Sequence, residues 1–492
     1  MTPQVSARTA AGFREVRQRL SAPLQVAVAG RIKSGKSTLV NALIGRRVAP
    51  TAVGECTRLV TRFQYGNVDR VELVFRDGGK RVLAFDADGM IPAELGVDLA
   101  KVSHLEAYLT NAVLSDLTVI DTPGLGSADT ASVARTRQLL NSGEPDAATN
   151  NRLDATSMSA VAGAEAVLYV LTQGVRADDT DALAAFTAAT AGRESGPVNV
   201  IAVLNKADTI APESVDGADG DLWRAARLLA ARQARLLRPT VADVLPVIGL
   251  LAESAKAGAF TSHDADALRK LAEVDEAGWQ MMMAATDIFA SWECEVPEGV
   301  RHRLLELLDL HGIAVAVQAL RAEPGMTAGA VRRMLFEASG LADVRARLDS
   351  VFRARADGIK AAAALASVTA LAHASGDPGE RQRVHDGIEV LLASPQAHQL
   401  RLLEALTLVT SQAVDMPEDL ADEVLRVGSN ARIAEQLGLP GRPVAELACH
   451  ALERAGWWRS FASFGATPAQ SRVAQVVHRA YFLIWRGLRD AS

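Results

Sequence analysis

The sequence predicts a doubly wound α/β domain followed by an elongated all-α helical bundle that forms a neck and trunk. Three observations support this: aliphatic strands alternate with helical patterns over about 230 residues, the first strand leads into a glycine-rich loop typical of phosphate binding, and helical periodicity dominates after about residue 256. We therefore expect a short N-terminal helix packing on the bundle, the α/β domain and the helical region, covering residues 1–21, 22–255 and 256–492.

Composition narrows the class of protein. Charged residues make up 22% and hydrophobic residues 49% of the chain, as in ordinary globular proteins, and the net charge of −6 argues against nucleic acid as the main partner. The three cysteines are too far apart to suggest a disulfide framework or a zinc site, which favours the cytoplasm. We find no run of the roughly 18 to 20 uncharged apolar residues that a spanning helix needs, so any membrane contact should be peripheral.

The expected elements of the α/β domain follow from periodicity and turn signals. An amphipathic helix at 8–20 comes before the first strand, and Asp-Gly and Gly-Gly at 77–79 predict a tight hairpin. The expected strands are 24–29, 71–75, 81–85, 117–120, 166–171, 198–204 and 244–248, and the expected helices are 37–43, 179–190 and 221–237.

Two stretches of the helical half stand out. The longest predicted helix runs from Leu341 to about Ser375, which would form a long arm. The segment GWWRSFASFG at 456–465 holds four of 22 aromatic residues; spacing favours Trp457, Phe461 and Phe464 as one core-facing stripe that leaves out Trp458. The alternative is insertion of these aromatics among lipid headgroups, and the turn at 375–380 is a second candidate membrane tip.

The stretch GRIKSGKST, from Gly30 to Thr38, matches a phosphate-binding loop between a strand and a helix. Gly30 and Gly35 allow the backbone to turn its N–H groups toward a phosphate. Lys36 is expected to reach the β- and γ-phosphates and to take part in catalysis, and the Ser37 hydroxyl is expected to ligate Mg²⁺. The predicted nucleotide-binding residues of the loop are Gly30, Lys33, Ser34, Gly35, Lys36, Ser37 and Thr38.

Two later motifs extend this site. In DTPG, Asp121 at the end of a strand suits a contact to Mg²⁺, and Gly124 can offer its N–H to the γ-phosphate. In NKAD, formed by Asn205, Lys206 and Asp208, the aspartate can accept two hydrogen bonds from guanine that adenine cannot donate. The loop at 248–250, with Gly249, is expected to support the base although it lacks the usual Ser-Ala. The motifs together predict a P-loop GTPase domain that binds GTP and Mg²⁺.

A threonine between the phosphate loop and DTPG should complete the Mg²⁺ coordination. Thr51, Thr57 and Thr61 are the candidates. We choose Thr57 as a metal ligand and catalytic residue because it follows the glycine-bearing turn in VGECTRLV. Thr51 and Thr61 would then be structural.

The order GRIKSGKS, Thr57, DTPG and NKAD resembles that of a dynamin-superfamily GTPase. APTAVGECTRLVTRF at 49–63 and GLLAESAK at 249–256 are similar to the isoniazid-inducible bacterial dynamin-like proteins. The resemblance is specific in the first 256 residues and architectural in the rest. It implies GTP hydrolysis, association of GTPase domains as a homodimer or with a paralogue, and membrane fusion or fission by a protein bound peripherally to the inner face of the cell membrane.

One departure from that family concerns hydrolysis. Dynamins usually carry Gln and Ser where this chain has Ile32 and Lys33, and residue 125 is leucine rather than a water-orienting glutamine. We hypothesise that Lys33 supplies the positive charge that stabilises the transition state, although a solvated lysine on the loop rim fits the sequence equally well. Two other functions stay open: a regulatory or assembly GTPase acting on a protein or ribonucleoprotein without lipid, and a scaffold that scarcely hydrolyses GTP.

Overall fold

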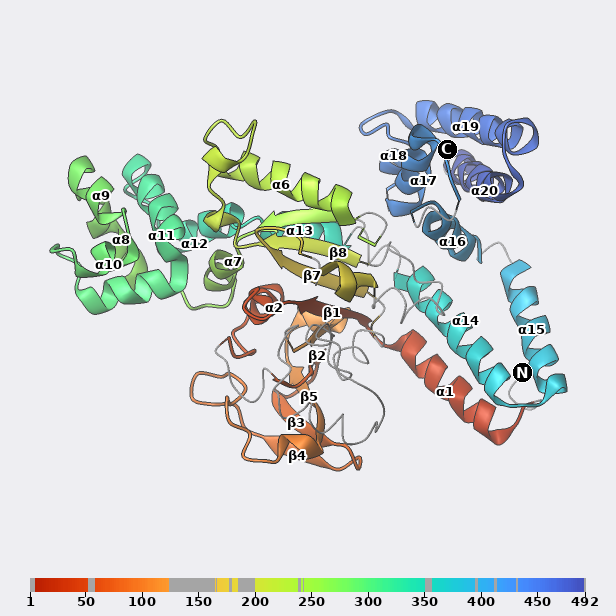
Figure 1. Ribbon diagram of the computed structural model, residues 1–492, viewed down its shortest axis with the longest axis horizontal. Coiled ribbons are helices and arrows are strands. Elements are labelled where there is room, and N and C mark those ends of the chain that lie inside the picture. Colours follow the sequence, from red (N-terminus) through yellow and green to blue (C-terminus); the bar gives the residue numbers. More distant parts are fainter. Residues whose placement is uncertain are drawn as a thin grey trace, which may run out of the picture.

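A computed structural model shows a central sheet with helices on both faces and further helices at either end (Figure 1). The description covers residues 5–51, 58–123, 164, 166–176, 179–184, 200–237, 240–241, 243–349, 356–393, 397–410, 414–430 and 432–490. Within these residues, no helix is both long and apolar enough to cross a bilayer.

Nine strands of the described chain form one mixed sheet in the order β4-β3-β5-β2-β6-β1-β7-β8-β9. Neighbours from β6 to β9 along this order run parallel, whereas β2 is antiparallel to β6 and the β3–β4 hairpin is antiparallel throughout. The predicted strands and hairpin are confirmed, and β2 and β5 were not predicted as strands. The bounds are β1 Leu24–Gly30, β2 Thr61–Tyr65, β3 Arg70–Phe75, β4 Lys80–Leu83, β5 Val102–Leu109, β6 Leu117–Asp121, β7 Ala166–Thr172, β8 Val200–Asn205 and β9 Asp243–Val247.

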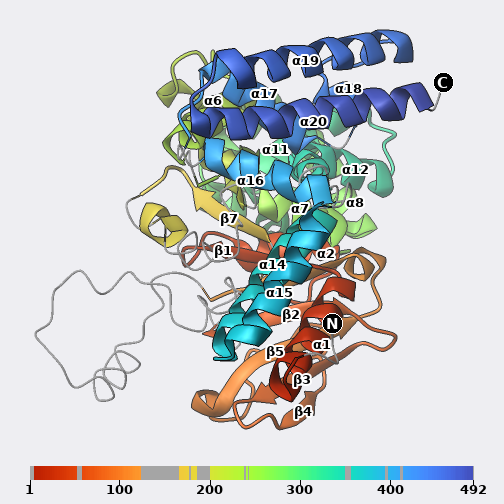
Figure 2. The ribbon, with the colours of Figure 1, turned by 90° about the vertical axis from the view of Figure 1, so that its right-hand side faces the viewer.

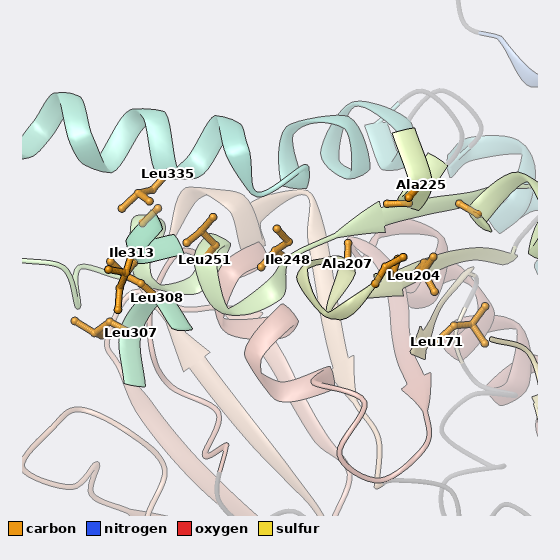
Figure 3. Close-up of a cluster of buried hydrophobic side chains, with 14 of the residues drawn as sticks. Leu171, Leu204, Ala207, Ala225, Ile248, Leu251, Leu307, Leu308, Ile313 and Leu335 are labelled. Carbon is orange, nitrogen blue, oxygen red and sulfur yellow. The ribbon is translucent and has the colours of Figure 1, made fainter. Parts of the chain in front are cut away.

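The sheet buries a separate hydrophobic cluster on each face, because alternate residues of each central strand point in opposite directions. One cluster packs against α6, α8, α11 and α12, as Figure 3 shows for Leu204, Leu308 and Leu335. The other packs against α2 and α13, while α7 contributes Leu251 to the first cluster and Ala252 to the second. The bounds are α2 Lys36–Ile44, α6 Leu222–Leu237, α7 Gly249–Lys256, α8 Ser262–Ala272, α9 Glu276–Met282, α10 Thr286–Ser291, α11 Glu298–Ala322, α12 Ala328–Ala338 and α13 Leu341–Leu348.

Helix α2 and helices α6 to α13 therefore share their cores with the sheet. Leu304 and Leu335 lie in one cluster, and Leu341 and Val344 lie in the other. The expected domain boundary at residue 255 stays a prediction, and a cut there would divide both clusters. We propose instead that the nucleotide-binding unit extends to Leu348.

The remaining helices form a second group at the opposite end of the sheet from α8–α12 (Figures 1 and 2). Helices α16, α17, α19 and α20 share a third hydrophobic cluster, and α14 packs with α1, α15 and α16. At the α1–α14 contact, a Cβ on Gly12 would lie 2.6 Å from Leu371. The bounds are α1 Ala7–Ser21, α14 Ala356–Ala374, α15 Pro378–Ala393, α16 His398–Thr410, α17 Glu418–Ser429, α18 Ile433–Gln436, α19 Val444–Phe464 and α20 Pro468–Asp490.

The all-helical C-terminal region is confirmed, with two qualifications. The helix predicted from 341 to 375 is described as α13 and α14, and residues 350–355 lie outside the described residues. The candidate tip at 375–380 ends in Glu380, which is buried and accepts hydrogen bonds from the Ser6 N–H and hydroxyl. That contact ties the start of α15 to the start of α1.

The predicted packing of the aromatic segment is wrong. Trp458 is fully buried, whereas Trp457 is 40% and Phe464 94% exposed. The reason is that the core-facing stripe of α19 is Leu447, Ala451, Ala455 and Trp458, rotated by about one residue from the aromatic stripe that we chose.

Candidate nucleotide site

The phosphate loop connects β1 to α2, and its two glycines are required by their surroundings. Gly30 has φ 150° and Gly35 has φ 87°, in the region that favours glycine. A Cβ on Gly30 would lie 2.5 Å from the Val170 carbonyl oxygen, and one on Gly35 would lie 2.3 Å from Asn205 Nδ2. No other residue type fits either position without displacing its neighbour.

Lys36 and Ser37 open helix α2 beneath this loop. Lys36 is buried, and its Nζ donates to the Arg31 carbonyl oxygen at 2.9 Å. Burial lowers the pKa of the Lys36 ammonium, while the nearby Asp121 carboxylate opposes part of that shift. The Ser37 hydroxyl donates to Asp121 Oδ2 at 2.8 Å. The structure therefore brings Lys36, Ser37 and Asp121 together, as the sequence predicted.

The donor set at this point fits a divalent cation and a phosphate. Asp121 Oδ1 and Ser34 Oγ are buried and have no hydrogen-bond partner among the described residues. Burial raises the pKa of the Asp121 carboxyl to about 6, a shift that a bound cation would oppose. One hydroxyl and one carboxylate suit Mg²⁺, which takes few protein ligands and fills its other positions with water and phosphate oxygens. Among the described residues, no group of three His, Cys, Asp or Glu side chains offers another metal site.

Asn205 joins the motif NKAD to both neighbouring loops. Its Nδ2 donates to the Ser34 carbonyl oxygen at 2.8 Å, and its Oδ1 accepts from the Gly249 N–H at 2.9 Å. Lys206 has φ 59°, and Asp208 follows in a single 3₁₀ turn. Burial raises the pKa of the Asp208 carboxyl. The phosphate loop, the guanine motif and the loop at Gly249 thus meet at one amide side chain.

The position of the metal-completing threonine stays a prediction. Thr57 and Gly124 lie outside the described residues. Thr51 is exposed. Thr61 is buried and lies opposite Asp121 in the antiparallel β2–β6 ladder, so it stays an alternative to Thr57.

The rim of the phosphate loop carries the two unusual residues. Ile32 is 42% exposed, and Lys33 is exposed with φ 61°. A positive φ at a lysine is uncommon, and here it belongs to the turn that brings the Ser34 N–H to the Arg31 carbonyl oxygen. Lys33 therefore stands at the mouth of the loop, where a role in catalysis stays a proposal.

Asn41, which we did not single out from the sequence, anchors the chain that leaves α2. It is fully buried; its Oδ1 accepts from the Val48 and Ala49 N–H groups, and its Nδ2 donates to the Ala49 carbonyl oxygen and to Glu253 Oε1 at 2.7 Å. Burial raises the pKa of the Glu253 carboxyl, while Asn41 and then Arg47 oppose that shift. The available signal was a polar residue in the apolar run LVNALIG.

A second missed contact holds the far end of α2. Arg345 of α13 donates through Nη2 to the carbonyl oxygens of Ala42 and Leu43. These carbonyls lie in the last turn of α2, where a cation is favourable. No sequence signal could have paired positions about 300 residues apart. Helix α2 is therefore held at its N-terminus by the nucleotide loop and elsewhere by α7 and α13.

The comparisons with known proteins agree with this geometry. Residues 26–207 match the model of the dynamin family. The chain is 32% identical over 456 residues to the isoniazid-induced protein IniC of Mycobacterium tuberculosis, covering 90% of this chain and 85% of that relative. The chain belongs to the dynamin family.

Two other likenesses are weaker. Dynamin-like protein 2 of Campylobacter jejuni is 30% identical over 123 residues, which is 24% of this chain and 19% of that protein. A solved structure of an oligomerised bacterial dynamin pair aligns with 99% of this chain and 88% of its own, at 12% identity and a TM-score of 0.31. The family assignment makes this dynamin-like protein a GTPase.

Proposed function

We propose that this GTPase depends on Mg²⁺ and remodels membranes, by fusion or fission, as a peripheral protein on the inner face of the cell membrane. The observation that carries the proposal is the pair of polar contacts from α2 to α7 and α13, Asn41 to Glu253 and Arg345 to Ala42 and Leu43. They connect the nucleotide loop with helices that lead into the rest of the chain.

Different residues of the site are proposed to bind the phosphates, the guanine base and Mg²⁺. The loop from Gly30 to Thr38 receives the phosphates, Lys36 binds the β- and γ-phosphates, and Asp208 accepts the guanine N–H groups. Ser37 and Asp121 hold Mg²⁺, which neutralises charge on the phosphates when bound. Asn205 and Gly249 fix the base loop against the phosphate loop.

The contacts of α2 give nucleotide binding a route to the helical region. Glu253 lies in α7, whose next residue Ser254 donates its hydroxyl to the Leu307 carbonyl oxygen of α11 at 2.5 Å. Helix α13, which carries Arg345, is the last described element before α14. A shift of α2 on GTP binding would therefore move α7 and α13, and membrane binding at the helical end would act back on the site with the same coupling energy. Association of GTPase domains, between two copies or with a paralogue, completes the proposed cycle.

Co-sedimentation with liposomes, with and without a non-hydrolysable GTP analogue, tests this function when turnover is measured in the same samples. We expect binding that depends on nucleotide and turnover that rises on the membrane. A protein that neither sediments nor assembles, yet responds to a protein or ribonucleoprotein partner, would be a regulatory GTPase instead. Binding of GTP without measurable turnover would indicate a scaffold.

Lys33 is proposed to stabilise charge between the β- and γ-phosphates, in place of the missing glutamines. Lys33→Ala should lower turnover by at least about tenfold and change its potassium dependence. Lys36→Ala should abolish nucleotide binding. Lys101 is exposed and lies outside the loop, so Lys101→Ala should leave turnover and its potassium dependence unchanged. If Lys33→Ala retains the turnover and potassium dependence of the unaltered protein, Lys33 is only a solvated residue of the loop rim.

A further inference from the structure

The C-terminal helical hairpin has a charge pattern unlike that of the whole chain. From Arg454 to Arg489 the sequence contains six arginines and no aspartate or glutamate, although the full chain carries a net charge of −6. This stretch covers the second half of α19 and nearly all of α20. This stretch therefore carries a net positive charge within an acidic chain.

Three of these arginines form a ridge along α20. Arg472, Arg479 and Arg486 recur every seven residues, which places them on one face of the helix. All three are exposed, and the opposite face is buried through Val473, Val477 and other apolar residues. At 1.5 Å per residue the ridge is about 21 Å long. No ion pair recorded within the described residues engages any of the three, whereas Arg454 pairs with Glu423 and Arg489 with Asp490.

An exposed aromatic tip adjoins the ridge. Phe464 is the last residue of α19, immediately before the turn into α20, and its side chain is 94% exposed. Trp457 lies two turns earlier on the same face, is 40% exposed, and stacks on Phe461 at a centroid distance of 5.4 Å. Phe461 packs against the third hydrophobic cluster, whereas the side chains of Trp457 and Phe464 are exposed.

We infer that the α19–α20 hairpin is a docking surface for anionic phospholipid, with Phe464 entering the headgroup region and the ridge of Arg472, Arg479 and Arg486 binding the lipid charges. This inference rests on the proposed membrane function and adds the place and the lipid class. Arginines near an anionic bilayer attract it over a distance of about one Debye length, and an aromatic side chain is favourable at the interface. A nearly fully exposed phenylalanine at a turn distinguishes this surface from a purely electrostatic nucleic-acid site.

The test is binding of the full-length protein to phosphatidylcholine vesicles with and without phosphatidylglycerol, at low and high salt. We expect binding only to the anionic vesicles and weaker binding as salt rises. R472Q/R479Q/R486Q should lower the affinity at least about tenfold and remove most of the salt dependence. Phe464→Ser should lower the affinity while the salt dependence stays. Thermal melting and turnover without vesicles should match those of the unaltered protein in both variants.

The matched control is R227Q/R232Q/R235Q, which removes the same charge from exposed positions of α6. It should bind vesicles like the unaltered protein. If the α6 control weakens vesicle binding as much as the ridge variant does, the hairpin is not the docking surface, although the membrane function stands. The same conclusion follows if neither hairpin variant weakens vesicle binding. If the unaltered protein binds no vesicle, both proposals fail. Binding of a DNA duplex or a single-stranded RNA in place of vesicles would reassign the ridge to nucleic acid.

Discussion

The two helical regions of this chain look alike in sequence but are held in opposite ways. Helices α7 to α13 share two hydrophobic clusters with the sheet and make polar contacts with α2. Helices α16, α17, α19 and α20 have a cluster of their own, and its buried polar group, Glu423, accepts from Arg454, Trp458 and Tyr481. The first region is therefore packed as part of the nucleotide-binding unit, whereas the second has a core of its own.

Removing Glu423 should have the largest effect on stability and should act on the second region alone. The pKa of this carboxyl is lowered because its hydrogen bonds to Arg454, Tyr481 and Trp458 outweigh the effect of burial. Glu423→Ala leaves those donors unpaired and should cost about 3–5 kcal/mol in the free energy of unfolding. Hydrogen exchange of α17, α19 and α20 should accelerate.

The control is Glu453→Ala, an exposed glutamate of α19. GTP affinity should stay unchanged in both variants. A parallel loss of GTP affinity in Glu423→Ala would show that the two regions are not independent.

Asn41→Ala should have the next largest effect and should act on the first region alone. It removes the hydrogen bonds to Val48 and Ala49 and leaves the buried Glu253 carboxylate without its amide partner. We expect a loss of about 2–3 kcal/mol in the free energy of unfolding. Amide exchange at Val48 and Ala49 should rise while exchange around Tyr481 stays the same. Equal acceleration of amide exchange at Val48 and Ala49 and around Tyr481 would show that the two helical regions are not independent.

The pH dependence of stability should show a smaller effect at the nucleotide site. Burial raises the pKa of Asp121 from its ordinary 3.8 to about 6, so the folded protein binds a proton more tightly than the unfolded chain does. Without nucleotide and metal, its contribution to stability is present below about pH 4 and is lost as the pH rises through about 6. The melting temperature of Asp121→Asn relative to the unaltered protein should therefore increase by a few degrees between pH 4.5 and 7. A melting-temperature difference between the two proteins that does not vary with pH would contradict the raised pKa of Asp121.

Sequence reasoning recovered the parts of the fold that have local signals. Asp121 and Asn205 follow aliphatic strands, and the structure places both beside the phosphate loop. Strand β5 was missed although its apolar residues Leu105, Ala107 and Leu109 alternate with half-exposed polar ones, which is the pattern of a half-buried strand.

Other features depend on tertiary packing and have no local signal. In α19 the aromatic residues cover two adjacent faces, and periodicity alone could not tell that Trp458 is the buried one. The partners of α2, Glu253 and Arg345, come from distant parts of the chain. The phosphate loop was therefore predictable, whereas its connection to the helices was not.

The most direct test of the account is GTP turnover of Arg345→Ala on saturating anionic vesicles. Arg345 touches neither the phosphate loop nor the hairpin, but it joins α13 to the last turn of α2. We expect basal turnover and vesicle binding to persist while stimulation of turnover by vesicles falls at least about fivefold. Arg332→Ala, an exposed arginine of α12, should keep full stimulation. Full stimulation in Arg345→Ala would contradict the claim that α2 and α13 link nucleotide to membrane.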